Sequence, residues 1–131
     1  MALNENFTEV FKRHIGALIQ QVTGLSAVFY RRSFGAAYPR AVFSWTVWVE
    51  SPDEMRGTLT VEVYGNAQEA QVDALGQKLL NQLDGATDRD PELWYYLHSG
   101  RLSGAESTDK TITSRTFTCE FMAAETGETN V

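Results

Sequence analysis

The chain has 131 residues, of which 43% are hydrophobic and 21% charged, so it fits one soluble globular domain that needs no metal ion or disulfide to fold. The formal net charge of −6 argues against nucleic-acid binding as the main source of affinity, because such binding depends on Lys and Arg neutralising phosphates. The single cysteine, Cys119, excludes an internal disulfide and suits synthesis in a reducing cytosol.

The first predicted element is a helix over residues 6–22. Hydrophobic residues recur along it at steps of three and four, which places them on one stripe. Asn6 and Glu9 have the spacing of a capping box, and Gly24 is suited to end the helix. We expect the apolar stripe to lie on a sheet.

Three strands are predicted next, over residues 27–31, 41–50 and 57–64. The short connection between the second and the third predicts an antiparallel hairpin. In the second strand, alternation assigns one face to the core and leaves a tryptophan and a valine on the face that should be polar. The predicted core face is Ala41, Phe43, Trp45, Val47 and Val49, and the predicted outer face is Val42, Ser44, Thr46, Trp48 and Glu50.

A second helix is predicted to begin at Asn66, with Glu69 at capping-box spacing, and to end at Asp84 and Gly85. We expect residues 84–92 to form a loop. An extended segment follows it, and a final strand begins near residue 111. In that strand Ile112 is out of phase with the later apolar residues, which predicts a bulge or bend near Ser114.

These elements predict an α+β domain over residues 1–124, with a disordered tail over residues 125–131. We expect a single, mostly antiparallel sheet of about four to five strands, with two main helices packed on one face. Because one face of the sheet covers both helical stripes, the second face stays open unless loops or partners close it.

Motifs that carry chemistry are missing from the sequence. No Cys, His or carboxylate pair has metal-ligand spacing, and there is no Gly-rich phosphate loop or nucleophile elbow. We therefore expect no enzyme activity, no metal and no cofactor. A small ligand-binding or enzymatic domain, with a pocket on the open sheet face, remains an alternative because sites assemble from distant segments. No apolar run approaches the roughly 20 residues that span a membrane, and the first residues lack a secretory signal.

Aromatic and arginine residues outside the predicted core indicate a protein–protein interface, where these residue types concentrate. Alternatives remain open: a loop or the C-terminal tail of the same chain covers Trp48, and the basic residues are simply solvated or contact nucleic acid. The predicted interface consists of Val42, Trp48 and Tyr64 on the open face, with Arg31, Arg32, Tyr38 and Arg40 in a basic segment.

Four segments in order carry a resemblance to a known family: TGLSAVFYRR at the end of the first helix, the Tyr-Pro loop AAYPRAVFSW, the strand–helix unit GTLTVEVYGNAQEAQVDALGQKLLNQLDG, and the closing strand STDKTITSRTFTCEFMA. Over residues 7–122 this order resembles the tail terminator, or tail-completion, proteins of long-tailed phages. Related head–tail connector and minor tail subunits of phages share similar outlines.

The resemblance implies a virion protein of the tail, assembled in the host cytoplasm. Such a protein forms a ring, commonly of six copies, that sits on the last ring of the tail tube, stops polymerisation and offers a surface for head–tail joining. The implied partners are further copies of the chain, the tail tube protein and the head–tail connector protein, with DNA only passing through the lumen. A head-completion or connector protein of the phage neck is the alternative, and no catalytic residue transfers from the family.

Overall fold

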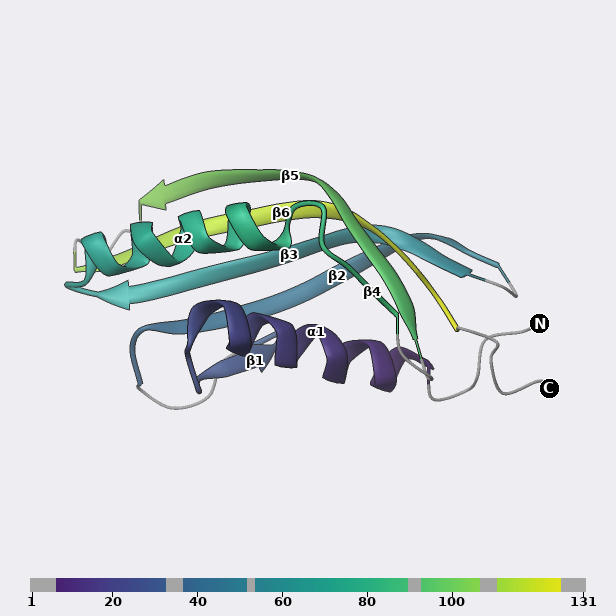
Figure 1. Ribbon diagram of the computed structural model, residues 1–131. Helices are drawn as coiled ribbons and strands as arrows, with labels where there is room; N and C mark the ends of the chain where they lie inside the picture. Colours follow the sequence, from purple (N-terminus) through teal and green to yellow (C-terminus); the bar gives the residue numbers. More distant parts are fainter. Residues whose placement is uncertain (1–6, 33–36, 52–53, 90–92, 107–110, 126–131) are drawn as a thin grey trace.

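The computed structural model describes residues 7–32, 37–51, 54–89, 93–106 and 111–125, which form two helices and six strands (Figure 1). The elements are α1 (Phe7–Thr23), β1 (Val28–Tyr30), β2 (Arg40–Glu50), β3 (Glu54–Asn66), α2 (Glu69–Leu83), β4 (Thr87–Arg89), β5 (Trp94–Glu106) and β6 (Ile112–Ala124).

The six strands form one mixed sheet in the order β1-β2-β3-β6-β5-β4. The pair β1–β2 is parallel, and the other pairs are antiparallel. The prediction of a sheet of four to five strands is therefore wrong. The strand that it omits is β4, which lies within the segment predicted as a loop. Three residues are too few to show an alternating pattern, so β4 exists through its pairing with β5.

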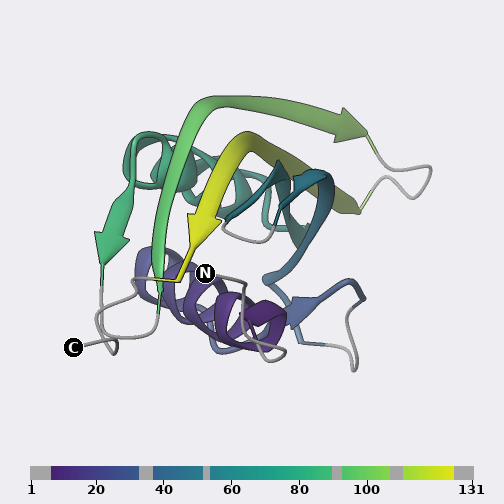
Figure 2. The same cartoon turned by 90° about the vertical axis from the view of Figure 1, so that its right-hand side faces the viewer.

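The sheet curls around the two helices, which lie on its inner side (Figure 2). The ring of Phe11 on α1 is fully buried and contacts Trp45 of β2 and Phe121 of β6, at centroid distances of 4.9 and 5.0 Å. On α2, Val72 and Leu79 are buried in the same core. One face of the sheet therefore covers both apolar stripes, and neither of the two described helices lies on the outer face.

Strands β3 and β6 form the centre of the sheet and pair without interruption from Glu54 opposite Ala124 to Asn66 opposite Ile112. The bulge that the sequence suggested near Ser114 is therefore absent from this pairing. Register shifts occur instead in the flanking strands, between residues 47 and 49 of β2 and between residues 98 and 101 of β5.

The second helix begins three residues later than predicted. Asn66 is the last residue of β3, and its backbone N–H donates to Oε1 of Gln68 at 3.2 Å. Gln68 occupies the N-cap position without a side-chain cap bond, so the capping box predicted for Asn66 and Glu69 is wrong. The corresponding prediction for Asn6 lies outside the described residues. Gly24 follows α1 with φ of +73°, a conformation typical of a helix C-cap.

Gly57 allows β2 and β3 to approach each other beside the register shift in β2. A Cβ atom at this position would lie 2.9 Å from the ring of Phe121 and would overlap the backbone carbonyl of Thr46. We predict that Gly57→Ala lowers the free energy of unfolding by about 1–3 kcal/mol, because the strand pair must move apart. Urea unfolding followed by circular dichroism measures the change.

The matched control is Gly104→Ala on β5, where a Cβ would meet only the Arg115 side chain at an ordinary 3.6 Å. We expect that variant to stay within about 0.5 kcal/mol of the wild type. Equal stabilities for the Gly57 and Gly104 variants would contradict the close approach at Gly57.

Candidate interaction surface

The outer face of the sheet, which we call the open face, is polar in its middle and apolar at one end. Its side chains form rows across β2, β3, β6 and β5, because partners in neighbouring strands point to the same side. Going along the strands, these rows are Val42–Glu62–Thr116–Ser103, Ser44–Thr60–Thr118–Arg101, Thr46–Thr58–Glu120–His98 and Val49–Arg56–Met122–Tyr96.

The apolar end is built around the register shift in β2. Val47 pairs with Gly57 and Val49 pairs with Arg56, so Trp48 is an extra residue in β2. An extra residue reverses the alternation of side chains beyond it. Val49 therefore leaves the core face that alternation predicts for it and joins the open face.

All three residues at this shift are exposed, with 37% of Val47, 54% of Trp48 and 50% of Val49 accessible to solvent. We call Val47, Trp48 and Val49 the β2 arm. The exposure of Val47 is also contrary to the predicted core face. Burial in β2 is confined to its first half, where Ala41 and Phe43 face the helices. The arm therefore offers apolar side chains on a part of the strand that the core does not use.

Strand β5 extends the apolar end across the sheet. Tyr96 is 39% exposed, and its ring stacks on that of His98 at a centroid distance of 5.1 Å. Nδ1 of His98 lies 3.6 Å from Oε2 of Glu120 on β6. Tyr96 was not among the predicted interface residues, although its alternation with the buried Tyr95 and Leu97 is visible in the sequence.

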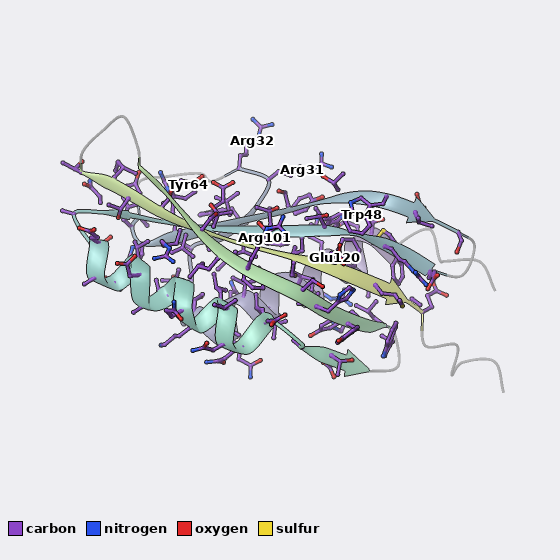
Figure 3. All side chains as sticks on the ribbon, turned by 90° about the horizontal axis from the view of Figure 1, so that it is seen from above. Arg31, Arg32, Trp48, Tyr64, Arg101 and Glu120 are labelled. Carbon is purple, nitrogen blue, oxygen red and sulfur yellow. The ribbon has the colours of Figure 1, made fainter. Side chains whose placement is uncertain are left out.

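Tyr64 lies far from Trp48 on the open face (Figure 3). It pairs with Arg40, and eight residues of strand, about 26 Å, separate Arg40 from Trp48. The predicted open-face residues are therefore spread over the face: Val42 lies in the row of Glu62, close to Tyr64, and Trp48 lies at the other end.

Tyr64 and Arg40 are engaged within the chain. The hydroxyl of Tyr64 donates to the carboxylate of Glu62, and Nη2 of Arg40 donates to the Tyr38 hydroxyl at 2.7 Å. The Arg40 guanidinium also lies 4.2 Å from the centroid of the Tyr38 ring. Burial, followed by the hydrogen bond to Glu62 and its charge, raises the pKa of Tyr64 to about 12.

The remaining predicted residues, Arg31 and Arg32, are exposed at the end of β1. Arg31 has φ of +69°, and its guanidinium lies 5.2 Å from the centroid of the Tyr30 ring. Nζ of Lys12 on α1 lies 5.4 Å from the same ring. An open hollow between α1 and β1 is lined by residues that include Lys12 and Tyr30. The structure thus adds α1 residues to this basic segment.

The described residues contain neither a metal-binding cluster nor a reactive cysteine. Among them, no group of three or more His, Cys, Asp or Glu side chains is placed to hold a metal ion. Cys119 is buried, and its burial raises the pKa of the thiol to about 12, so the thiol stays protonated at neutral pH. Neither described helix is long and apolar enough to cross a membrane.

Comparison with known proteins identifies structures that share the fold. No protein-family model matches the chain, and no curated protein matches its sequence. A solved structure that carries no functional description aligns with a TM-score of 0.64 and 8% identity, over 93% of this chain and 96% of that chain. A chain from the virion of a native gene transfer agent particle aligns with a TM-score of 0.52 and 15% identity, over 83% of this chain and 84% of that chain. The protein therefore shares its fold with a virion subunit.

The pKa of Tyr64 gives a test of the open-face geometry. We predict that the tyrosinate absorbance lost in Tyr64→Phe has a midpoint near pH 12, about two units above the ordinary value of 10. The folded state holds this proton more tightly than the unfolded state. The associated stability is therefore full below pH 10 and is lost as the pH rises through 12. Ultraviolet titration of wild type minus variant measures the midpoint.

Glu62→Gln is the control for the cause. It removes a charge and a charged acceptor that both raise the Tyr64 pKa, so we expect the midpoint to fall. A difference midpoint near 10 in the wild type would contradict the contact between Tyr64 and Glu62.

Proposed function

We propose that the chain is a structural subunit of a virion, and that it caps the tail tube of a long-tailed phage as a ring, stops tube polymerisation and provides the surface for head–tail joining. One observation carries the coarser part: the fold is shared, over most of both chains, with a chain of a gene transfer agent virion, a phage-like particle. The finer role rests on the resemblance of the segment order to tail terminator proteins.

The shape of the open face supports a protein contact. This face is the outer side of a curled sheet, so it is convex (Figure 2). Ligand sites are concave and have convergent polar groups, whereas protein interfaces are broad and have aromatic residues near their centre. The hollow described above lies between α1 and β1, away from Trp48 and Tyr96. The position of the exposed aromatics therefore favours an interaction surface over a pocket.

Capping a tube needs no catalysis, and we propose none. A cap works by occupying the end to which the next tube ring would bind. Burial of the exposed part of Trp48 against the tail tube protein supplies affinity, since a fully buried large apolar side chain contributes about 1.5–3 kcal/mol. A ring presents one β2 arm per copy, so modest single contacts add to a stable cap.

The other proposed partners follow from the same position in the virion. The ring contacts further copies of the chain at its sides and the head–tail connector protein on the side away from the tube. DNA passes through the lumen and does not contribute to assembly. A connector protein of the neck would share the fold and the ring, but it would bind the head in preference to the tube.

We predict that Trp48→Ala weakens capping. Added to polymerising tail tube protein of the same particle, the wild type should give short tubes with a closed end. The variant should need about 10- to 100-fold more protein for the same effect, which corresponds to about 1.5–3 kcal/mol of lost apolar burial. Tube length distributions from negative-stain electron microscopy measure the result.

Tyr64→Phe is the control, since it removes only the hydroxyl oxygen of a side chain at the far end of the open face and keeps its aromatic ring. It should cap as the wild type does. Wild-type protein that leaves tube length unchanged would end the tube-capping proposal. Wild-type binding to portal-bearing heads in place of tubes would favour the neck alternative.

A further inference from the structure

Basic and acidic residues are distributed unevenly along this chain. Residues 10–49, which supply β1, nearly all of β2 and most of α1, contain five Lys or Arg residues and no Asp or Glu. Residues 50–131 contain fifteen Asp or Glu and six Lys or Arg. Strands β1 and β2 lie at one end of the strand order, and β5 and β4 lie at the other. The net charge of −6 therefore conceals a positive and a negative side of the molecule.

The positive side is concentrated at the α1–β1 border. Lys12 and Arg13 lie on α1, and Arg31 and Arg32 follow β1, the terminal strand of the described sheet. The side chains of Lys12 and Arg31 both approach the Tyr30 ring, which joins the two pairs into one surface. We call Lys12, Arg13, Arg31 and Arg32 the basic edge. Glu9 lies within this edge, with its Oε2 2.8 Å from Nζ of Lys12.

The negative side includes the opposite terminal strand. Asp84 ends α2 and Asp88 lies on β4, and both are exposed. The carboxylate of Asp84 accepts the N–H of Gly100 at 2.9 Å, which fixes its position. We call Asp84 and Asp88 the acidic edge. Figure 2 shows β1 and β4 on opposite sides of the molecule.

We propose that the basic edge of one copy contacts the acidic edge of the next, so that copies associate head to tail. This inference rests on the proposed ring and identifies the two surfaces that form it. Two different patches on opposite sides of a subunit make a heterologous contact. Such contacts close into a ring when a whole number of the rotations between neighbouring copies makes one full turn. Two basic edges, or two acidic edges, repel each other, so the charges also select against the wrong pairings.

A second copy fits the basic edge better than DNA does. Every copy that presents the basic edge also presents an acidic edge, so the complementary partner is supplied with the chain. DNA would be attracted to the same four cations but repelled by the acidic remainder, which makes up most of the chain.

The test measures native mass by light scattering on a sizing column, over a range of protein concentrations, at about 0.05 M and about 1 M salt. We expect wild-type assemblies larger than a dimer at low salt, and association at least tenfold weaker at high salt. Arg31→Glu/Arg32→Glu should weaken low-salt association at least tenfold. Asp84→Asn/Asp88→Lys should do the same, since asparagine can still accept the Gly100 N–H.

Mixing the two double variants is the decisive step. The two glutamates introduced into the basic edge of one variant face the lysine introduced into the acidic edge of the other, and the unaltered edges also have opposite charges. We therefore expect the equimolar mixture to recover the wild-type mass. Arg56→Glu/Arg101→Glu changes the net charge as much as Arg31→Glu/Arg32→Glu does, at two exposed sites on the open face, and should leave association unchanged.

Several results would overturn the edge contact: a monomer under every condition, a mass fixed at a dimer, association that salt does not weaken, or a mixture that fails to recover. Binding of a short labelled DNA duplex that is lost in Arg31→Glu/Arg32→Glu, with the mass unchanged, would assign the basic edge to nucleic acid. If both double variants cap tubes like the wild type, the edge contact fails and the proposed function stands. If the charge tests succeed and no tube is capped, the edge contact stands and the proposed tube-capping function fails.

Discussion

The uninterrupted pairing of β3 with β6 is the constraint on which the rest of the structure depends. Thirteen residues of β3 pair with thirteen of β6 in one register. Because side chains alternate between faces, this single register decides that Leu59, Val61 and Phe117 are buried together. A slip by one residue would turn them outward and leave both helices without a surface to cover. The open face is therefore fixed by the same choice that builds the core.

The flanking strands depart from this regularity, and their departures shape the candidate surface. In β2, the register shift at Trp48 accompanies the exposure of three successive apolar side chains, two of which alternation had assigned to the core. In β5, the shift between residues 98 and 101 includes Ser99 with φ of +56° and Gly100, which packs closely against Asp84 and Phe117. The central strands thus hold the fold, and the irregular flanks are where side chains become available to partners.

Elements with a strong local period were predictable from the sequence. The apolar stripe of α1 and the buried faces of β3 and β6 follow directly from spacing, because many residues repeat the same signal. The three residues of β4 carry no such signal, and their strand depends on β5. In β2 the arm is apolar at Val47, Trp48 and Val49 in succession, so alternation assigned two of them to the core. Only the register against β3 shows that a residue is inserted there.

The candidate surface was predictable in part, for the same reason. Alternation singled out Trp48, and the structure shows it exposed, although its role as a contact stays a prediction. Tyr64 was chosen by the same rule, but its hydroxyl is occupied by Glu62, its neighbour on the same face two residues earlier. The surface around Arg31 includes Lys12, which joins it through the Tyr30 ring across a gap of many residues in sequence. Pairing and packing, not local pattern, bring these side chains together.

Net charge was the least informative of the sequence quantities, since it sums charges that the fold keeps apart. Identical subunits with a uniform charge of −6 would repel one another in a ring, and the repulsion would grow with each added copy. In the proposed ring, cations at the α1–β1 border and acids near β4 would convert part of that repulsion into attraction between neighbours. In the proposed contact with a tube, the β2 arm would contribute through apolar burial, which does not weaken with salt as exposed ion pairs do. Contacts between neighbouring copies and contacts with a tube would therefore respond differently to ionic strength. At high salt, a cap already bound to its tube would stay bound through the β2 arms even though the contacts between its subunits are weaker.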